Sequence, residues 1–241
     1  MSLNDLAIVR ARPYKLQNHI ALPKEDKRPI FEIITTLVKE CKKRKIAITG
    51  EETSVQNNIN GIDISLTVSG FIKKRKPNLA KIGDKIIGIQ SNGLHSNGFT
   101  KIREIFNGKF KSDFILPTNI YWDIIYKLNQ RFDIHGMMHI TGGAFTKLKD
   151  FLKGASAIIR KNHQLYPQEI FKEIYKKGVP DKEMYKTFNC GIGFVVTVTP
   201  RDTAKILLAL KDFKADIIGE IIPGKGMIEI ESMFGKKIIK L

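Results

Sequence analysis

The sequence has little cysteine: its two cysteines, Cys41 and Cys190, lie far apart along the chain. Two distant cysteines provide neither a disulfide framework nor the close ligand spacing of a zinc site. No apolar run approaches the roughly 20 residues that a membrane-spanning helix needs. The first residues also lack the basic segment followed by an apolar stretch that is typical of a signal peptide. These absences predict a cytoplasmic protein with no membrane partner.

Acidic residues are few relative to basic ones. The chain has 24 Asp and Glu against 41 Lys and Arg, which gives a formal net charge of +17. Such a protein attracts phosphate groups on nucleotides, small substrates or nucleic acid. Cations gather at residues 42–45, where they close an expected helix, and at residues 73–76. Neither run contains aromatic residues that would stack on bases, so the pattern disfavours nucleic acid. A basic nucleic-acid-binding protein is kept as the alternative from another functional class.

The 241 residues, 42% of them hydrophobic, suffice for one large core or two modest ones. Loose alternation predicts a strand at residues 14–22, and Pro29 at a first helical position starts a helix with apolar residues at helical spacing. Residues 46–48 and 63–72 are predicted strands. The basic segment at residues 73–81 is the best domain boundary, which predicts domains 1–76 and 77–241.

The second part mixes strands and helices without strict alternation, which predicts an α+β or mixed α/β fold. A helix that begins at Pro200 is expected to have Thr199 as its cap. The last two strands, residues 217–222 and 227–230, are expected to form a closing pair around residues 223–226. The other predicted strands are residues 85–90, 155–159 and 194–198, and the other helices are residues 100–106, 119–130, 144–152 and 167–177.

Two glycine-rich turns are the most informative local features. Ser-Asn-Gly occurs twice, at residues 91–93 and 96–98, between a predicted strand and a predicted helix. Gly and Asn tolerate left-handed backbone, and a concave row of N–H groups attracts phosphate. A similar Thr-Gly-Gly turn at residues 141–143 precedes another helix. Ordinary polar turns are the alternative interpretation. Near the start of the chain, Asp5 is either a helix N-cap, which the pattern favours, or a metal ligand.

Three longer motifs carry a family resemblance: Gly-Leu-His-Ser-Asn-Gly at residues 93–98, His-Ile-Thr-Gly-Gly at 139–143 and Glu-Met-Tyr-Lys-Thr-Phe-Asn-Cys-Gly-Ile-Gly at 183–193. With Asn-Asp-Leu at 4–6 and Gly-Glu-Glu-Thr at 50–53, they resemble aminoimidazole ribonucleotide synthetase over essentially the whole chain. Families that make selenophosphate or thiamine diphosphate, or that mature hydrogenases, share this fold but match the motifs less well. A kinase-like member of one of those families is the second enzymatic alternative.

The resemblance implies an ATP-dependent ligase of purine biosynthesis. ATP phosphorylates the formyl oxygen of formylglycinamidine ribonucleotide, the amidine nitrogen closes the imidazole ring, and phosphate leaves. The implied cofactors are ATP and Mg²⁺. The implied fold is part of a β-barrel that forms across a homodimer, followed by a layered α/β domain.

The resemblance also implies roles for individual residues. Asp5 and Glu52 would hold the metal, with Asp63 as a weaker third carboxylate, and Asn4 and Thr53 would join them at the nucleotide. His95 and Asn97 would be catalytic. The phosphorylated ribonucleotide would contact Ser96, Gly98, Thr141, Gly142, Gly143 and Asn189. We expect the carboxylates and the glycine loops to converge on one pocket.

Some features depart from the family pattern. The family's glycine-rich nucleotide loop and its Asp-Gly-Val-Gly-Thr-Lys motif do not occur in this sequence. We therefore expect the chain as given to transfer ATP phosphate poorly, while it keeps phosphate affinity at residues 96–98 or 141–143. Supplying the absent segment should raise the rate. Glu51 stands where the family has glycine, and its role, like those of Arg10 and Arg12, is left open.

Overall fold

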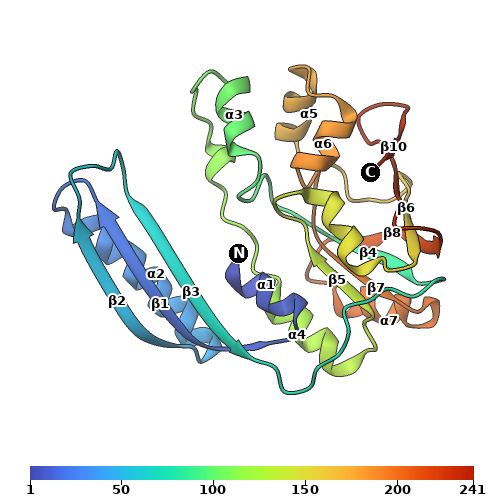
Figure 1. The fold of residues 1–241 in the computed structure, drawn as a ribbon, viewed down its shortest axis with the longest axis horizontal. Coiled ribbons are helices and arrows are strands. Elements are labelled where there is room, and N and C mark those ends of the chain that lie inside the picture. Colours follow the sequence, from blue (N-terminus) through green and yellow to red (C-terminus); the bar gives the residue numbers. More distant parts are fainter. The chain divides into compact units, whose positions relative to one another are not determined.

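The computed structural model describes residues 1–241 and divides into two compact units, Met1–Arg75 and Lys76–Leu241 (Figure 1). The division falls within the basic segment at residues 73–81. Strands and helices are mixed in both units, so the predicted mixed α/β fold is confirmed. None of the helices combines the length and the apolar composition that crossing a membrane requires.

The first unit is a three-stranded sheet in the order β2-β1-β3. Strand β1 (Arg12–Leu22) runs parallel to β2 (Ala47–Val55) and antiparallel to β3 (Asp63–Phe71). Helix α2 (Lys27–Arg44) connects the two parallel strands, and the short helix α1 (Ser2–Ile8) precedes the sheet. The predicted order of strand, helix, strand and strand is confirmed.

Local chemistry explains the limits of α2. The side chain of Asp26 accepts a hydrogen bond from the N–H of Arg28 (3.0 Å), and Lys45 ends the helix with a left-handed φ of 56°. Cations fill the last turn, where they suit the helix dipole as predicted. Pro29 is the third helical residue rather than the first. The N-cap assigned to Asp5 is also wrong, because α1 begins at Ser2 with Met1 as its cap.

The second unit is built on a seven-stranded sheet in the order β10-β9-β6-β8-β4-β7-β5. All neighbouring strands are antiparallel except β6 and β9. Every residue of β7 is buried, which makes it the centre of the core on the β4–β5 side of the sheet. The strands are β4 (Lys85–Gln90), β5 (Gly136–His139), β6 (Ala155–Ile159), β7 (Ile192–Val198), β8 (Ala215–Pro223), β9 (Ile228–Glu231) and β10 (Ile238–Lys240).

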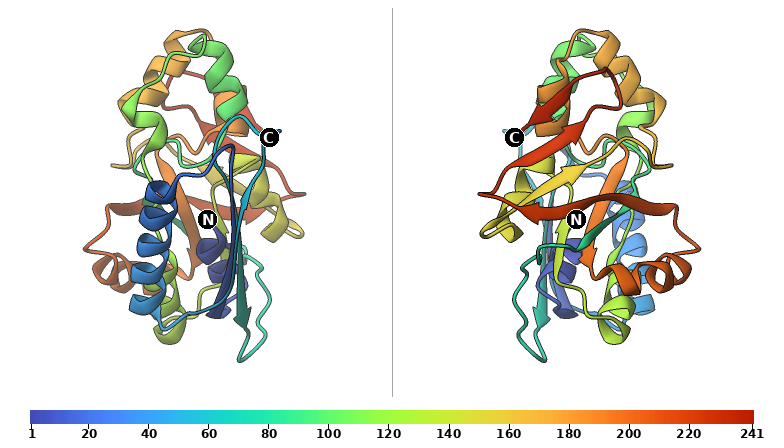
Figure 2. Two further views of the ribbon diagram at one scale, coloured as in Figure 1. Left: turned by 90° about the vertical axis from the view of Figure 1, so that its left-hand side faces the viewer. Right: turned by 90° about the vertical axis from the view of Figure 1, so that its right-hand side faces the viewer.

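Short helices surround this sheet, and Figure 2 shows α7 beside α4 at one end of the unit. The α-helices are α3 (Phe99–Ile105), α4 (Trp122–Arg131), α5 (Glu169–Lys176), α6 (Asp181–Thr187) and α7 (Thr203–Ala209). The 3-10 helices are η1 (Ser112–Ile115), η2 (Ala144–Phe151) and η3 (Pro200–Asp202).

Several predictions for this unit are wrong in detail. Strands β8 and β9 are not a pair, because β6 lies between them and bonds to both. Residues 144–151 form a 3-10 helix rather than an α-helix, and another 3-10 turn at η3 separates Thr199 from α7. Strands β5 and β10 and helix α6 were not predicted.

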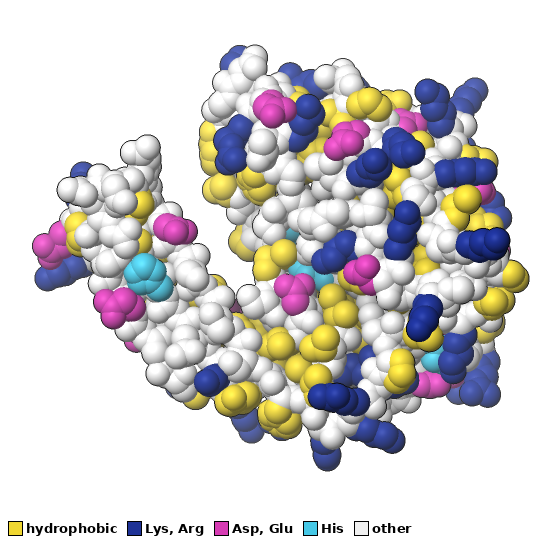
Figure 3. Space-filling view, viewed as in Figure 1, with side chains coloured by type: hydrophobic (Ala, Val, Ile, Leu, Met, Phe, Trp, Pro, Cys, Tyr) yellow, Lys and Arg dark blue, Asp and Glu magenta, His cyan; other side chains and the backbone are white.

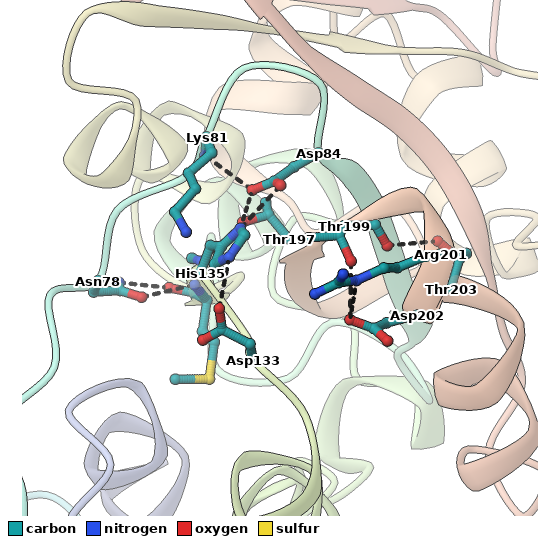
Figure 4. Close-up of polar contacts among 12 residues, drawn as sticks. Asn78, Lys81, Asp84, Asp133, His135, Thr197, Thr199, Arg201, Asp202 and Thr203 are labelled. Carbon is teal, nitrogen blue, oxygen red and sulfur yellow. Dashed lines mark hydrogen bonds and ion pairs between the residues drawn. The ribbon is translucent and has the colours of Figure 1, made fainter.

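A polar network fixes the start of the second unit to β5 (Figure 4). The buried ring of His135 lies between two carboxylates: Nδ1 is 2.8 Å from Asp84 Oδ2, and Nε2 is 3.1 Å from Asp133 Oδ2. Asp84 also accepts a hydrogen bond from the N–H of Lys81 (2.9 Å), and Asp133 is paired with Lys76. The network therefore connects residues 76–84 to the edge strand of the sheet.

The Asp133 carboxylate is expected to make stability depend on acidity. Its bond to Lys76, followed by that to His135, lowers the pKa of Asp133 from 3.8 to about 2. Because the folded pKa lies below the unfolded one, the stabilisation is complete above pH 3.8 and is lost as the pH falls through about 2. We expect Asp133→Asn to lower the free energy of unfolding at pH 7 by at most about 1 kcal/mol, since the carboxylate is exposed.

The measurement is urea unfolding of Asp133→Asn and the wild type between pH 7 and pH 2. Asp150→Asn, which removes an exposed carboxylate outside the network, is the control and should be neutral. A deficit in Asp133→Asn that stays constant across this range would contradict the assignment.

Candidate functional site

The pairing of three strands brings most of the predicted site residues of the second unit together. Strand β7 lies between β4 and β5 and runs antiparallel to both, with Gln90 opposite Ile192 and His139 opposite Phe194. The ends of β4 and β5 and the start of β7 therefore meet at one edge of the sheet. The loops at residues 91–98, 140–143 and 188–191 emerge there, and they contain the predicted residues.

The side chain of Asn189 joins two of these loops. Its Oδ1 accepts hydrogen bonds from Ser91 Oγ (2.8 Å) and from the N–H of Gly191 (3.0 Å), and its Nδ2 donates to the carbonyl oxygen of Gly93 (2.8 Å). Asn189 is completely buried. These internal contacts explain why an amide is needed at this position. A contact between Asn189 and substrate stays a prediction.

A second set of hydrogen bonds determines the tautomer of the His95 ring. Asn92 Nδ2 donates to the carbonyl oxygen of Pro117 (2.6 Å), so its Oδ1 faces His95 Nε2 at 3.0 Å. An oxygen acceptor requires the proton to be on Nε2, which leaves His95 Nδ1 without one. That Nδ1 atom is buried and has no hydrogen-bond partner. His95 is thus held as one neutral tautomer.

Burial, followed by the neighbouring ring of His139, whose centroid is 6.2 Å away, lowers the pKa of His95 from 6.5 to about 3. The imidazole is therefore neutral at physiological pH. Asn97 is also buried, and its Nδ2 donates to the carbonyl oxygen of Ile140 (3.3 Å). This bond links the first glycine loop to the second.

Two glycines leave room for the aromatic side chains beneath the loops. A Cβ at Gly193 would overlap the Tyr121 hydroxyl and lie 2.8 Å from His95 Cε1. At Gly98, where φ is +69°, a Cβ would overlap Phe188 Cε1. The backbone at Gly193 in β7 and at Gly98 in the first glycine loop can approach these rings only because neither position has a side chain.

The surface of the site is formed by Ser96, Gly142 and Gly143, which are exposed, while Thr141 is buried. Lys147 Nζ donates to Thr141 Oγ1 (3.0 Å), which places a cation at the second glycine loop. Such a loop with an adjacent ammonium group is suited to binding anions.

Three contributors were not predicted. Gln168 Nε2 donates to the carbonyl oxygen of Ser91, and Tyr121 Oη donates to that of Gln90 (2.8 Å). Lys147 lies four residues beyond Gly143, in the 3-10 helix η2. Only Lys147 had a local signal, its position after the glycine turn. The other two make contacts that no short motif encodes.

The remaining predicted residues lie in the first unit, with Asn4 and Asp5 on α1, Glu52 and Thr53 on β2, and Asp63 at the start of β3. Glu52 is paired across the sheet with His19, whose Nε2 is 3.0 Å from Ser54 Oγ.

Glu51 points to the opposite face of the sheet from Glu52, because successive strand residues alternate. There it accepts a hydrogen bond from Asn18 Nδ2 (3.3 Å). No three His, Cys, Asp or Glu side chains in the chain are grouped as a metal site. A pocket shared by Asp5, Glu52 and the glycine loops stays a prediction.

Family comparisons match both units. The model described as "AIR synthase related protein, N-terminal domain" matches residues 1–72, and that described as "AIR synthase related protein, C-terminal domain" matches residues 81–230. The chain belongs to the AIR synthase family. The resemblance found in the sequence motifs is thereby confirmed.

Curated relatives of this chain are named as cyclo-ligases. The phosphoribosylformylglycinamidine cyclo-ligase of Methanobrevibacter smithii is 37% identical over 242 residues, which cover 92% of this chain and 71% of that protein. The enzyme of the same name from Thermococcus kodakarensis is 34% identical over 256 residues, covering 99% of this chain and 74% of the relative.

Solved structures share the fold of this family member at low sequence identity. Hydrogenase maturation protein HypE has a TM-score of 0.77 at 17% identity, over 99% of this chain and 79% of that one. HypE in complex with ATP has a TM-score of 0.75 at 17% identity, over 99% and 76%. Thiamine monophosphate kinase from Aquifex aeolicus has a TM-score of 0.66 at 16% identity, over 95% and 77%. These likenesses show the fold alone.

Gly98→Ala should destabilise the second unit more than a glycine substitution with the same backbone strain. Gly108 has a similar φ of +72°, but nothing lies within 4 Å of a Cβ there. We expect Gly108→Ala to cost about 1–2 kcal/mol for left-handed strain. Gly98→Ala should cost about 1–3 kcal/mol more because of the overlap with Phe188. Urea unfolding measures both, and equal losses would show that Phe188 moves aside freely.

His95→Asn should flatten the acid dependence of stability, and asparagine suits the left-handed φ of 57° at this position. Above pH 6.5 the ring is neutral in both states. Below pH 6.5 the histidine of the unfolded chain binds a proton, whereas the buried ring of the folded chain stays neutral down to about pH 3. The free energy of unfolding that is present above pH 6.5 is therefore lost as the pH falls.

The variant should remove up to about 1.4 kcal/mol per pH unit of this slope. Urea unfolding at several pH values between 7 and 4 is the measurement, with His19→Asn as a histidine control from the other unit. Identical slopes in His95→Asn and the wild type would refute the assignment of a buried neutral imidazole.

Proposed function

We propose that the chain acts in the ATP-dependent ring closure of formylglycinamidine ribonucleotide to aminoimidazole ribonucleotide. The observation that carries the proposal is the convergence of the three loops that hold the family motifs at the β4–β7–β5 edge. The loops offer exposed backbone at Ser96, Gly142 and Gly143, with Lys147 beside them. The cyclo-ligase names of relatives with 34–37% identity support the same activity.

In this proposal the second unit binds the phosphorylated ribonucleotide. Backbone N–H groups of the two glycine loops and the Lys147 ammonium neutralise the phosphate. His95 is neutral, so it acts as a hydrogen-bonding and positioning group rather than as the source of a proton at pH 7. Asn97 donates a hydrogen bond to the carbonyl oxygen of Ile140 and so links the two loops. Thr141, through its bond to Lys147, orients the cation.

The first unit would contact the nucleotide. Asp5 and Glu52 are carboxylates of the type that hold Mg²⁺, which would neutralise charge on the ATP phosphates. Asn4 and Thr53 accompany them on the same elements. The complex of HypE with ATP supports ATP as the nucleotide for this fold.

We also propose that the first unit forms a homodimer through its sheet. Strand β3 is an edge strand and exposes Ile64, Leu66 and Phe71, with 40–47% of each residue accessible. An edge strand with exposed apolar side chains favours pairing with another strand.

A basic nucleic-acid-binding protein is less well supported. Figure 3 shows Lys and Arg side chains dispersed over the face that it draws, rather than gathered in one stripe. Sequence-independent binding of nucleic acid typically needs a continuous basic surface.

Lys147→Gln should weaken binding of formylglycinamidine ribonucleotide about five- to tenfold, because an exposed charge-assisted contact contributes roughly 1 kcal/mol or slightly more. The matched control is Lys149→Gln, which removes an exposed lysine of the same 3-10 helix. Isothermal titration calorimetry measures both affinities, and formation of aminoimidazole ribonucleotide with ATP and Mg²⁺ is assayed in parallel.

Equal weakening by both substitutions would place the substrate phosphate elsewhere. Failure of the wild type to bind the ribonucleotide, together with binding of thiamine monophosphate or a DNA duplex, would overturn the proposed function.

A further inference from the structure

A groove between α4 and α7 lies apart from the site loops. It has a volume of about 790 Å³, and its apolar lining comes from both helices and the residue after α4: Ile124, Leu128, Phe132, Leu208 and Ala209. Leu208 has 73% of its surface exposed, and Ile124, Phe132 and Ala209 beside it are half-buried. An exposed apolar lining of this kind is typical of a surface that binds a partner.

Cations surround this lining. Lys127 and Arg131 extend from α4, while Lys205 and Lys211 lie on and just after α7. All four are exposed, and none belongs to an ion pair of the unit. The only carboxylate at the groove is Asp212. The groove therefore combines an apolar floor with an excess of uncompensated positive charge.

We propose that this groove docks an acidic amphipathic helix of a partner protein. Leucine-type side chains on one face of such a helix would cover Leu208 and the half-buried Ile124, and carboxylates on its flanks would face the four cations. Helix α4 has 10 residues, about 15 Å at 1.5 Å per residue, so about three turns of a docked helix fit alongside it.

Charge and side-chain chemistry disfavour the other occupants. A second copy that docked through the same groove would bring the same four cations against their own counterparts, so this arrangement is disfavoured by local repulsion. Two aromatic residues line the groove, Tyr126 and the half-buried Phe132. Tyr126 is already stacked on Trp122 with ring centroids 4.9 Å apart, so it is not free as a platform for nucleic-acid bases. An acidic helix satisfies both the apolar and the charged part of the groove.

The docking proposal is independent of the proposed function. None of the groove residues belongs to the loops at residues 91–98, 140–143 or 188–191. Substitutions in the groove should leave the affinity for formylglycinamidine ribonucleotide unchanged, so each proposal can fail without the other.

The test uses the full chain and a fluorescein-labelled 16-residue helical peptide with leucines on one face and glutamates on the other. The control peptide has the same composition with the leucines dispersed around the helix. Fluorescence anisotropy at physiological salt should show at least tenfold tighter binding of the amphipathic peptide.

The protein variants separate the groove from the general charge of the surface. Leu208→Asp should abolish the preference for the amphipathic peptide, and the double variant Lys127→Glu with Arg131→Glu should weaken its binding at least tenfold. The matched control is Lys109→Glu with Lys153→Glu, which makes the same charge change at exposed lysines outside the groove. It should weaken binding less than threefold. Thermal unfolding by circular dichroism verifies that each variant is folded.

Several results would overturn the proposal. Equal binding of the two peptides, or equal loss in the groove and control variants, would show diffuse attraction to a basic protein. Tighter binding of a labelled DNA duplex that Lys127→Glu with Arg131→Glu abolishes would assign the groove to nucleic acid. A wild-type dimer that Leu208→Asp dissociates in light scattering would assign it to a second copy.

Discussion

The antiparallel pairing of β7 with both β4 and β5 is the constraint on which the candidate site depends. It brings the ends of two strands and the start of a third to one edge of the sheet, although the loops that follow are about 50 residues apart in sequence. The Asn189 amide then connects the loops after β4 and before β7, using both its oxygen and its nitrogen. A buried amide with all its partners inside the protein fixes geometry, because loss of any partner leaves a polar atom without compensation.

The same packing decides the chemistry of the histidine. Since Gly193 has no side chain, the rings of His95 and Tyr121 approach the backbone of β7 closely. That approach removes His95 from water and lowers its pKa, while Asn92 holds the proton on Nε2. Histidine commonly transfers protons near neutral pH, but the packing of the strands keeps His95 neutral and fixed in orientation.

Local sequence patterns predicted the limits of individual strands. Residues 85–90 and 155–159 are apolar runs bounded by turn residues, and both are strands with these limits. Strand β6 lies between β8 and β9 although about 60 residues separate it from them in sequence. Strands that are adjacent in sequence usually pair as a hairpin, so the local pattern favoured the direct pairing of β8 with β9. In the site, the motifs located His95, Asn97 and the glycines through resemblance. The contacts of Gln168 and Tyr121 depend on tertiary packing, so no local pattern contains them.

Net charge alone does not identify the kind of partner that a basic protein binds. The positions of the cations are needed as well. A total of +17 is compatible with nucleic acid, phosphate ligands or acidic proteins. Its distribution separates these partners: one lysine, Lys147, is bonded into a glycine loop, while four cations surround an apolar groove between two helices. The first arrangement suits a small phosphate because the ammonium is held beside backbone N–H groups. The second suits an extended acidic surface because the charges are separated by leucine side chains that a phosphate cannot cover.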